Sequence, residues 1–269
     1  MVKLFDSHAH YFDPKFDELE GGADGLLSSA EFAEKIGGVV NVGTNLENSR
    51  IAIEMAEKYP MLWAAVGIHP EDCHAYDRDP TAAMVALEEM LFCSEEIRQK
   101  IVAIGEIGLD HYYPGYDGER EKAYFEAQMA LAGYHDMPVI IHDREAHGDV
   151  FDIVCKHPDV RGVMHSYSGS VELAREYVKR GYMISFSGVL TFKNGVKAKE
   201  VAAAIPLSSI LIETDCPYLA PVPYRGKLNS SLLMEETALA LAQIKGLSRD
   251  EVVEATAQNA KRFFGIETE

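Results

Sequence analysis

Histidines and carboxylates stand at the ends of apolar segments along most of this sequence. Such positions matter because the C-terminal ends of parallel strands in a barrel meet at one mouth, where reactive groups gather. His8 and His10 are two positions apart, so an extended chain points both imidazole rings to the same side. The residues with this placement are His8, His10, His69, Glu106, His142, His165 and Asp215.

The residue types in this set are those of a metal site. Neutral imidazole and carboxylate together suit Zn²⁺ or Mn²⁺, whereas Mg²⁺ prefers more oxygen ligands. One histidine at a strand end is more often an ordinary hydrogen-bonded residue, but several such groups in one mouth are costly to bury unless they pair or coordinate. Even without His69, four histidines and two carboxylates exceed the needs of one tetrahedral ion. They suit two divalent metal ions (Mg²⁺, Mn²⁺ or Zn²⁺) about 3.5–4 Å apart, bridged by one carboxylate.

Short apolar segments rich in valine and isoleucine alternate with longer stretches of helical periodicity. The apolar segments mostly lack strict polar alternation, which is typical of parallel strands buried on both faces. We expect strands at residues 3–8, 38–43, 62–69, 101–108, 138–143, 161–167, 181–188 and 209–215. We expect helices at residues 45–59, 80–92, 119–135, 144–156, 171–180, 196–204 and 231–246. Ser248 and Glu251 have the spacing of a capping box, which predicts a last helix ending at Phe264.

Eight strand-like segments, each followed by a helical one, predict the α/β class and a single (β/α)8 TIM barrel that spans residues 1–269 as one domain. An open doubly wound sheet is the alternative. The turn after the first strand of such a sheet usually carries a glycine-rich dinucleotide motif. Here that turn contains His8 and His10 instead, which favours the barrel.

The composition limits the class of protein further. Of the 269 residues, 47% are apolar and 25% are charged, which is enough apolar material for a large core. The four cysteines form no C-x-x-C pair, so we expect isolated reduced thiols rather than disulfides or a structural zinc site. No apolar run is long enough to cross a bilayer, and the N-terminal residues soon turn polar. We therefore expect a cytoplasmic protein with no membrane partner.

The charge balance bears on the substrate. There are 25 basic and 43 acidic side chains, for a net charge of −18. Binding to nucleic acids normally depends on lysine and arginine side chains that displace counterions from phosphates. We therefore expect no stable binding of long duplexes. Metal ions can supply positive charge locally, so DNA ends and short single strands remain possible substrates.

Seven motifs follow one another along the chain: DSHAH (6–10), GIHP (67–70), GEIGLD (105–110), IHDR (141–144), HSYSG (165–169), ETDCPY (213–218) and APVPYRGK (220–227). In both order and spacing they resemble the motifs of the TatD family of metal-dependent deoxyribonucleases. The resemblance covers essentially the whole chain and places it in a branch of the amidohydrolase-like superfamily. One such motif alone would be weak, but seven in order are specific.

The resemblance implies which residues hold which ion. The first ion would be bound by His8, His10, Glu106 and Asp215. Glu106 would also bridge to a second ion bound by His142 and His165. The activity that the resemblance implies is hydrolysis of DNA phosphodiester bonds, often from the 3′ end.

As a mechanism we expect metal-activated water to attack phosphorus. Asp215 would bind metal and accept the proton of that water, and Glu106 would be the second catalytic carboxylate. Phosphate groups in such barrels commonly lie near the loops after strands seven and eight. We expect substrate contacts from His69, Arg144, Lys193, Arg225 and Lys227. The lysines are also explained as solvated side chains, and Arg144 as the partner of a barrel carboxylate.

Two other functions remain open from the sequence. The same metal chemistry would hydrolyse an ester or amide of a small molecule, or an aminoacyl ester, and the acidic charge slightly favours such substrates. A non-catalytic metal-binding protein is the other alternative. The complete set of candidate ligands argues against it, because loss of activity usually tolerates loss of ligands.

Overall fold

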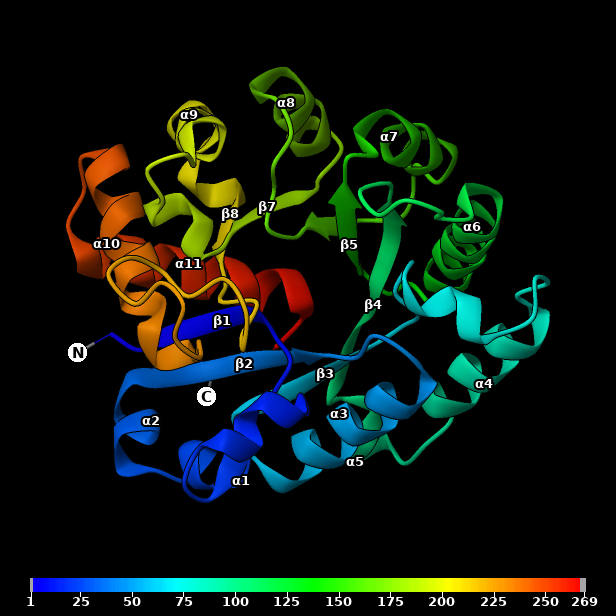
Figure 1. Ribbon diagram of the computed structural model, residues 1–269, viewed down its shortest axis with the longest axis horizontal. Coiled ribbons are helices and arrows are strands. Elements are labelled where there is room, and N and C mark those ends of the chain that lie inside the picture. Colours follow the sequence, from blue (N-terminus) through cyan, green and yellow to red (C-terminus); the bar gives the residue numbers. More distant parts are fainter. Residues whose placement is uncertain (1, 267–269) are drawn as a thin grey trace.

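A computed structural model describes residues 2–266 and contains one sheet of eight parallel strands in sequence order (Figure 1). The strands are β1 (Leu4–Ala9), β2 (Ile36–Val42), β3 (Leu62–Val66), β4 (Ile101–Asp110), β5 (Val139–Arg144), β6 (Gly162–Met164), β7 (Met183–Phe186) and β8 (Ile210–Ile212). Nearly every strand residue is buried, as expected for parallel strands covered on both faces.

Helices follow the strands and surround them (Figure 1). They are α1 (Gly22–Leu27), α2 (Ala30–Lys35), α3 (Leu46–Lys58), α4 (Thr81–Leu91), α5 (Glu95–Arg98), α6 (Gly118–Tyr134), α7 (His147–Lys156), α8 (Val171–Lys179), α9 (Val196–Ala204), α10 (Met234–Lys245) and α11 (Arg249–Phe264). The fold is therefore the (β/α)8 TIM barrel that the sequence predicts.

The barrel closes between β1 and the segment that follows β8. The Asp215 backbone N–H donates to the His8 carbonyl oxygen at 2.9 Å, and the His10 N–H donates to the Cys216 carbonyl oxygen at 2.8 Å. An isolated parallel bridge joins Ala9 to Cys216. Closure therefore occurs at the strand ends that carry candidate metal ligands, and it fixes Asp215 beside His8.

Two buried apolar clusters divide the core. One joins strand residues such as Phe5, Val40 and Val102 to Phe263 and Phe264 of α11. In Figure 1, α11 crosses behind the strands, so this cluster fills the barrel on the side away from the mouth. The larger cluster lies between the strands and the surrounding helices. The strands that carry the candidate ligands are therefore packed against apolar side chains both inside the barrel and on its outer surface.

Three strands end three residues before the expected position. Expected ends were residues 69, 167 and 215, whereas β3, β6 and β8 end at Val66, Met164 and Ile212. Ser166 and Asp215 have left-handed φ values of 39° and 57°, which cannot continue a strand. The histidine or aspartate expected within each of these strands therefore lies in the loop just after it.

Some helical features also differ from expectation. The short helices α1, α2 and α5 were not predicted, because segments of four to six residues carry little periodicity. Arg144, expected in a helix, ends β5, and α7 begins at His147. The expected helix from Ser231 begins as a 3-10 turn before α10. The capping box of Ser248 and Glu251 is present, and α11 ends at Phe264 as predicted.

The cysteines are free thiols, as the sequence predicts. Among residues 2–266, none of the helices combines the length and apolar character needed to cross a membrane.

Candidate metal centre

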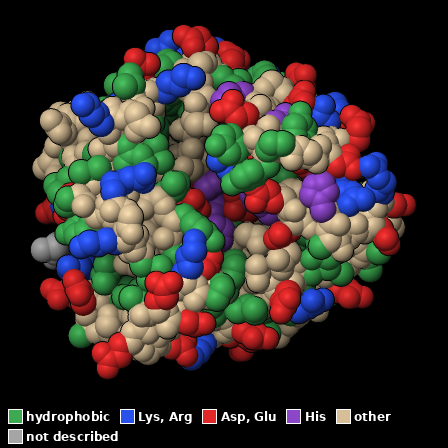
Figure 2. Space-filling model, in the orientation of Figure 1, with side chains coloured by type: hydrophobic (Ala, Val, Ile, Leu, Met, Phe, Trp, Pro, Cys, Tyr) green, Lys and Arg blue, Asp and Glu red, His purple; other side chains and the backbone are tan. Residues whose placement is uncertain are grey.

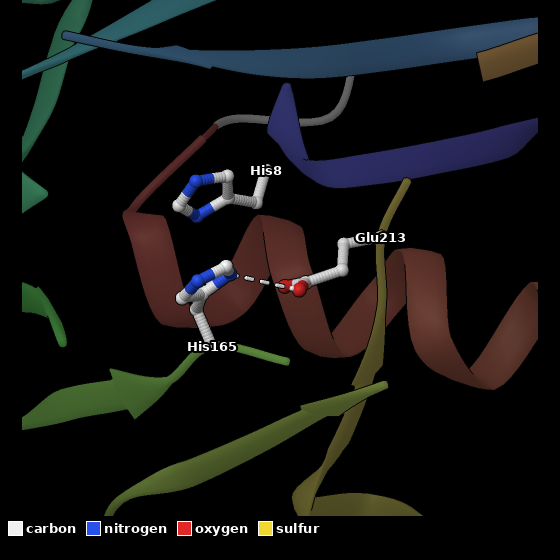
Figure 3. Close-up of side chains that lie close together, drawn as sticks. All are labelled: His8, His165 and Glu213. Atoms are coloured by element: carbon white, nitrogen blue, oxygen red, sulfur yellow. Dashed lines mark hydrogen bonds and ion pairs between the residues drawn. The ribbon is translucent and has the colours of Figure 1, made fainter. Parts of the chain in front are cut away.

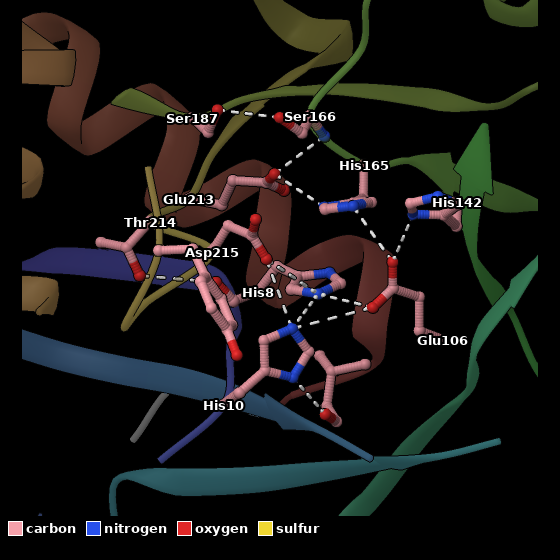
Figure 4. Close-up of polar contacts among 12 residues, drawn as sticks. His8, His10, Glu106, His142, His165, Ser166, Ser187, Glu213, Thr214 and Asp215 are labelled. Atoms are coloured by element: carbon pink, nitrogen blue, oxygen red, sulfur yellow. Dashed lines mark hydrogen bonds and ion pairs between the residues drawn. The ribbon is translucent and has the colours of Figure 1, made fainter. Parts of the chain in front are cut away.

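The first group of candidate ligands surrounds one oxygen of Glu106 and one of Asp215 (Figure 4). Nε2 of His8 lies 3.3 Å from Oε2 of Glu106, and Nε2 of His10 lies 3.3 Å from Oδ1 of Asp215. The two Nε2 atoms are 3.1 Å apart. Nitrogen and oxygen donors from three separate segments therefore point at one small volume.

The second group surrounds the other oxygen of Glu106. Nδ1 of His142 lies 2.9 Å from Oε1, and Nε2 of His165 lies 3.1 Å from it. The Glu106 carboxylate thus stands between two pairs of histidines, with one oxygen facing each pair (Figure 4). This is the placement that a bridging carboxylate needs.

Local irregularities in two strands help to aim these side chains. The register of β4 against β5 shifts between Ile104 and Ile107, on either side of Glu106. The register of β1 against β2 shifts between Asp6 and Ala9, on either side of His8. Irregular registers of this kind change the direction of a side chain and are frequent beside active sites.

Neighbouring oxygens orient the histidine rings. Nδ1 of His10 lies 2.7 Å from the Val42 carbonyl oxygen, which accepts its proton and turns Nε2 toward the cluster. Nδ1 of His165 donates in the same way to Oε1 of Glu213 at 2.9 Å (Figure 3). Glu213 is fully buried below the mouth, and this contact with His165 holds the ring from inside the barrel.

Burial and charge set the ionisation of the cluster. Burial opposes ionisation of Glu106, but electrostatic interactions with His165 and His8 hold its pKa well below the usual range. Burial likewise opposes ionisation of Asp215, but the hydrogen bond with His10 lowers its pKa. Both carboxylates are therefore available as anionic ligands at neutral pH.

His142 is held on both sides. Its Nε2 lies 2.9 Å from Oδ2 of Asp110, opposite its contact with Glu106. Burial lowers the pKa of His142, but the two carboxylate partners outweigh it and raise the pKa to about 9. A cation bound at Nδ1 must displace that proton. Asp110 would then remain as the group that orients the ring.

His69 is oriented to donate a hydrogen bond from Nε2. The Glu71 backbone N–H donates to Nδ1 of His69 at 3.2 Å, so the neutral ring carries its proton on Nε2. Burial, together with the charge of His142, lowers the pKa of His69 to about 3, which keeps the ring neutral. Its Nε2 lies 3.6 Å from Oε1 of Glu106, at the edge of the cluster.

The cluster lies at the bottom of a cavity of about 450 Å³ at the barrel mouth. Figure 2 shows histidines in this hollow, with apolar, acidic and basic side chains around it. His8 is fully buried beneath the cavity. The other five candidate ligands line it, as do His69 and Arg144.

Three of the expected substrate contacts lie elsewhere. Lys193, Arg225 and Lys227 are exposed and lie outside the set of residues that line the cavity. The Arg225 guanidinium instead stacks on Phe192, 3.8 Å from the ring centroid. The loops after β7 and β8 are long enough to carry these cations away from the mouth, and spacing along the chain gives no sign of that.

The cavity also contains residues that the sequence interpretation did not propose. Asn45 and Asn48, at the start of α3, line it together with Tyr113 from the loop after β4. Asn45 lies three residues after the end of β2 and caps α3, so its place in a short loop after a strand was a usable signal. The position of Tyr113 depends on the course of a loop, for which the sequence has no comparable signal.

The donor set fits a divalent cation. Three groups of side chains bring their donor atoms within 4.8 Å of one another: His8–His10–Glu106, His69–Glu106–His142 and His8–His165–Glu213. Imidazole nitrogens and carboxylate oxygens at such separations are the ligands of Zn²⁺ and related ions. Fold and site together define the class, a (β/α)8 barrel of the metal-dependent hydrolase kind.

The comparison with protein families gives the same class. A family model described as TatD related DNase matches residues 5–265, so this chain belongs to the TatD family. It is 39% identical to the uncharacterized metal-dependent hydrolase YabD of Bacillus subtilis, over 98% of this chain and 99% of YabD. It is 31% identical to the uncharacterized metal-dependent hydrolase YjjV of Escherichia coli, over 99% of each chain.

Solved structures show the same fold. The crystal structure of YjjV, a TatD homologue from Escherichia coli, matches with a TM-score of 0.88 and 29% identity over 99% of each chain. A TatD family hydrolase from Entamoeba histolytica matches with a TM-score of 0.82 and 21% identity, over 98% of this chain and 99% of that one.

Proposed function

We propose that this protein hydrolyses phosphodiester bonds of DNA, from the 3′ end of single strands, with two divalent metal ions and an attacking water. The family to which the chain belongs is described as TatD related DNases. The relatives named above are called metal-dependent hydrolases. The substrate class is therefore part of this proposal.

One observation carries the proposal: the two oxygens of Glu106 face different ligand groups. His8 and His10 lie on the side of Oε2, and His142 and His165 lie on the side of Oε1. A site for one ion needs only one such group. Two groups that share a carboxylate suit two ions about 3.5–4 Å apart, an arrangement used to cleave phosphoesters.

The residues of this chain have separate roles in the proposed reaction. Divalent ions, when bound, supply positive charge for the phosphate and lower the pKa of water from about 15.7 toward 7. His8, His10, Glu106 and Asp215 would hold one ion, and His142 and His165 with Glu106 the other. The ionised Asp215, 17% exposed at the cavity, would accept the proton of the attacking water.

His69 would assist at the phosphate. Its Nε2–H is directed into the cavity edge by the contact of Nδ1 with the Glu71 backbone. A neutral donor there can bind a phosphate oxygen and can strengthen that bond as negative charge develops in the transition state.

The first test compares wild type with Asp215→Asn on 3′-end-labelled single-stranded DNA, with Mg²⁺, with Mn²⁺ and with a chelator. Asparagine tolerates the left-handed conformation of this position, so the fold should persist while turnover falls by roughly 10²–10⁴-fold. Asp152→Asn, exposed on α7, is the matched control.

Undiminished turnover in Asp215→Asn would refute the role of Asp215. Absence of nucleotide release by the metal-loaded wild type would refute the DNA substrate. Parallel assays with small-molecule and aminoacyl esters would then identify an ester hydrolase that uses the same site.

A further inference from the structure

Tyr218 forms one wall of the cavity, and the Lys15 ammonium lies over its ring. Tyr218 follows β8, and its backbone N–H donates to the Asp215 carbonyl oxygen at 2.9 Å. Nζ of Lys15 lies 3.9 Å from the centroid of the Tyr218 ring, and the Tyr218 hydroxyl donates to Asp13 at 2.6 Å. The side chain is ordered by these contacts, yet Tyr218 remains 42% exposed and lines the cavity.

A second ring and cation form another wall. Tyr113, 49% exposed, lines the cavity from the loop after β4. The Arg144 guanidinium at the end of β5 lies 5.0 Å from its ring centroid and 3.8 Å from that of Tyr112. Arg144 also lies 3.8 Å from Asp110, which anchors the guanidinium beside the second ligand group.

The order of the strands places these two pairs on opposite sides of the mouth. Tyr218 and Lys15 belong to segments that follow β8 and β1, whereas Tyr113 and Arg144 belong to segments at β4 and β5. In an eight-stranded barrel with sequential order, β8 and β1 lie across from β4 and β5 (Figure 1). The cluster around Glu106 lies between them.

We propose that these two pairs are nucleobase-binding platforms, Tyr218–Lys15 on one side and Tyr113–Arg144 on the other. A single strand crosses the cavity with one base on each ring, so that the phosphodiester between the bases lies over the metal-binding cluster. The inference rests on the proposed function, because it concerns the substrate of the same site.

The chemistry favours a single strand over a duplex. Every base has a flat aromatic face, so stacking on tyrosine tolerates any sequence, but a base in a duplex is already stacked and paired. Stacking also depends less on charge than phosphate contacts do. It can therefore hold a nucleic acid on a protein whose net charge is −18.

The test uses single-stranded tetranucleotides with 2-aminopurine at either position flanking the scissile bond. The metal-loaded Asp215→Asn protein serves as the slow background for fluorescence titration, with metal content measured in each sample. Tyr218→Ala and Tyr113→Ala should each weaken binding by roughly 5–100-fold. A 2-aminopurine stacked on a ring is quenched, so each variant should restore fluorescence at a different one of the two positions. General structural damage would not give that result.

Matched variants sharpen the result. Tyr218→Phe and Tyr113→Phe keep the ring and should retain binding within about threefold. Tyr134→Ala removes a tyrosine that is 80% exposed on α6, outside the cavity, and should bind like the background protein. In the otherwise wild-type enzyme, the two alanine variants should lower kcat/KM on the same strands.

The failures of the two proposals are distinguishable. If wild type cleaves the strands while both alanine variants bind and cleave within twofold of their parents, the platforms are refuted and the nuclease stands. If quenching at both positions is lost in the variants but wild type cleaves nothing, the platforms stand and the nuclease is refuted.

Discussion

At the scale of single residues, the position of the Glu106 carboxylate organises the site. Its side chain is 4% exposed, and each oxygen lies within 3.3 Å of a histidine nitrogen from a different ligand group. Burial of an anion is tolerated because the surrounding imidazoles supply opposite charge and hydrogen bonds. A cation in either group would take over that role, so the same carboxylate can serve two ions.

His69 provides the prediction at this scale. His69→Ala removes the Nε2–H donor at the cavity edge and should lower kcat by roughly 10²-fold, as loss of one donor to a developing oxyanion does. Bound metal should be unchanged, because the ring presents a proton rather than a lone pair. Steady-state kinetics and metal analysis on the same samples measure both.

Two further variants complete that experiment. His69→Gln keeps an N–H donor and should recover part of the lost activity. His74→Ala removes an exposed histidine from the same loop and serves as the control. Loss of metal together with activity in His69→Ala would show instead that His69 is a ligand.

At the scale of elements, the strand ends and the loops just after them carry the chemistry, while α11 supports the barrel from the other side. The Asn259 side chain on α11 donates to the Leu207 and Ile210 carbonyl oxygens at 2.8 and 2.9 Å, which ties the helix to the start of β8. Phe263 and Phe264 extend the apolar cluster inside the barrel. Stability and catalysis are thus assigned to opposite sides of the barrel.

Ser248→Ala tests this separation. The Ser248 hydroxyl and the Glu251 side chain satisfy each other's backbone N–H groups at the start of α11, and loss of such a cap costs about 1 kcal/mol. The free energy of unfolding from urea denaturation should fall by that amount, with kcat unchanged. Ser94→Ala, which caps the four-residue α5, should have a smaller effect. Equal losses in both variants would contradict the role given to α11.

At the scale of the whole molecule, the net charge and the metal centre have opposite effects on an anionic substrate. The chain carries a net charge of −18, which repels a polyanion, while the mouth gathers ligands for cations. We therefore expect binding of a DNA substrate to depend on ionic strength and the stability of the protein to depend on bound metal. Each dependence can be measured separately.

Higher ionic strength should strengthen DNA binding by this protein, whereas it weakens DNA binding by a basic nuclease. Screening shortens the Debye length from about 30 Å at 0.01 M to about 8 Å at 0.15 M, which weakens repulsion between the acidic surface and DNA. At fixed metal concentration, KM for a single strand of about twenty nucleotides should fall by roughly twofold to fivefold over that range. A dinucleotide should show a weaker effect. A steep rise in KM with salt would mean that phosphate contacts dominate binding.

Removal of metal should destabilise the protein. A ligand whose free concentration is about 100 times its Kd stabilises the folded state by about 2.7 kcal/mol. For a domain of this size that corresponds to a Tm shift of roughly 5–10 °C. Calorimetry should show that chelation lowers the Tm and that added Mn²⁺ restores it. Asp215→Asn, with one ligand weakened, should show a smaller shift. An unchanged Tm after verified metal removal would contradict a metal centre built into the barrel.

The sequence by itself determined the class of fold and the residues that could bind metal. Eight apolar segments with helices after them predict the barrel, because buried parallel strands need apolar residues on both faces. Placing histidines and carboxylates at the segment ends predicts their convergence, because parallel strands end at the same side. The capping box of α11 was visible for a similar reason, since its signal lies within four consecutive residues.

Only the tertiary structure decided how those groups face one another. The division of the Glu106 oxygens between two ligand groups depends on contacts between residues up to 98 positions apart, such as His8 and Glu106. Of the expected substrate contacts, His69 and Arg144 line the cavity, whereas the loops after β7 and β8 carry Lys193, Arg225 and Lys227 elsewhere. Strand signals repeat along the chain, whereas the course of a loop depends on packing against distant residues. For that reason the gathering of the candidate metal ligands was predictable, whereas the wall formed by Tyr113 became apparent only in the folded protein.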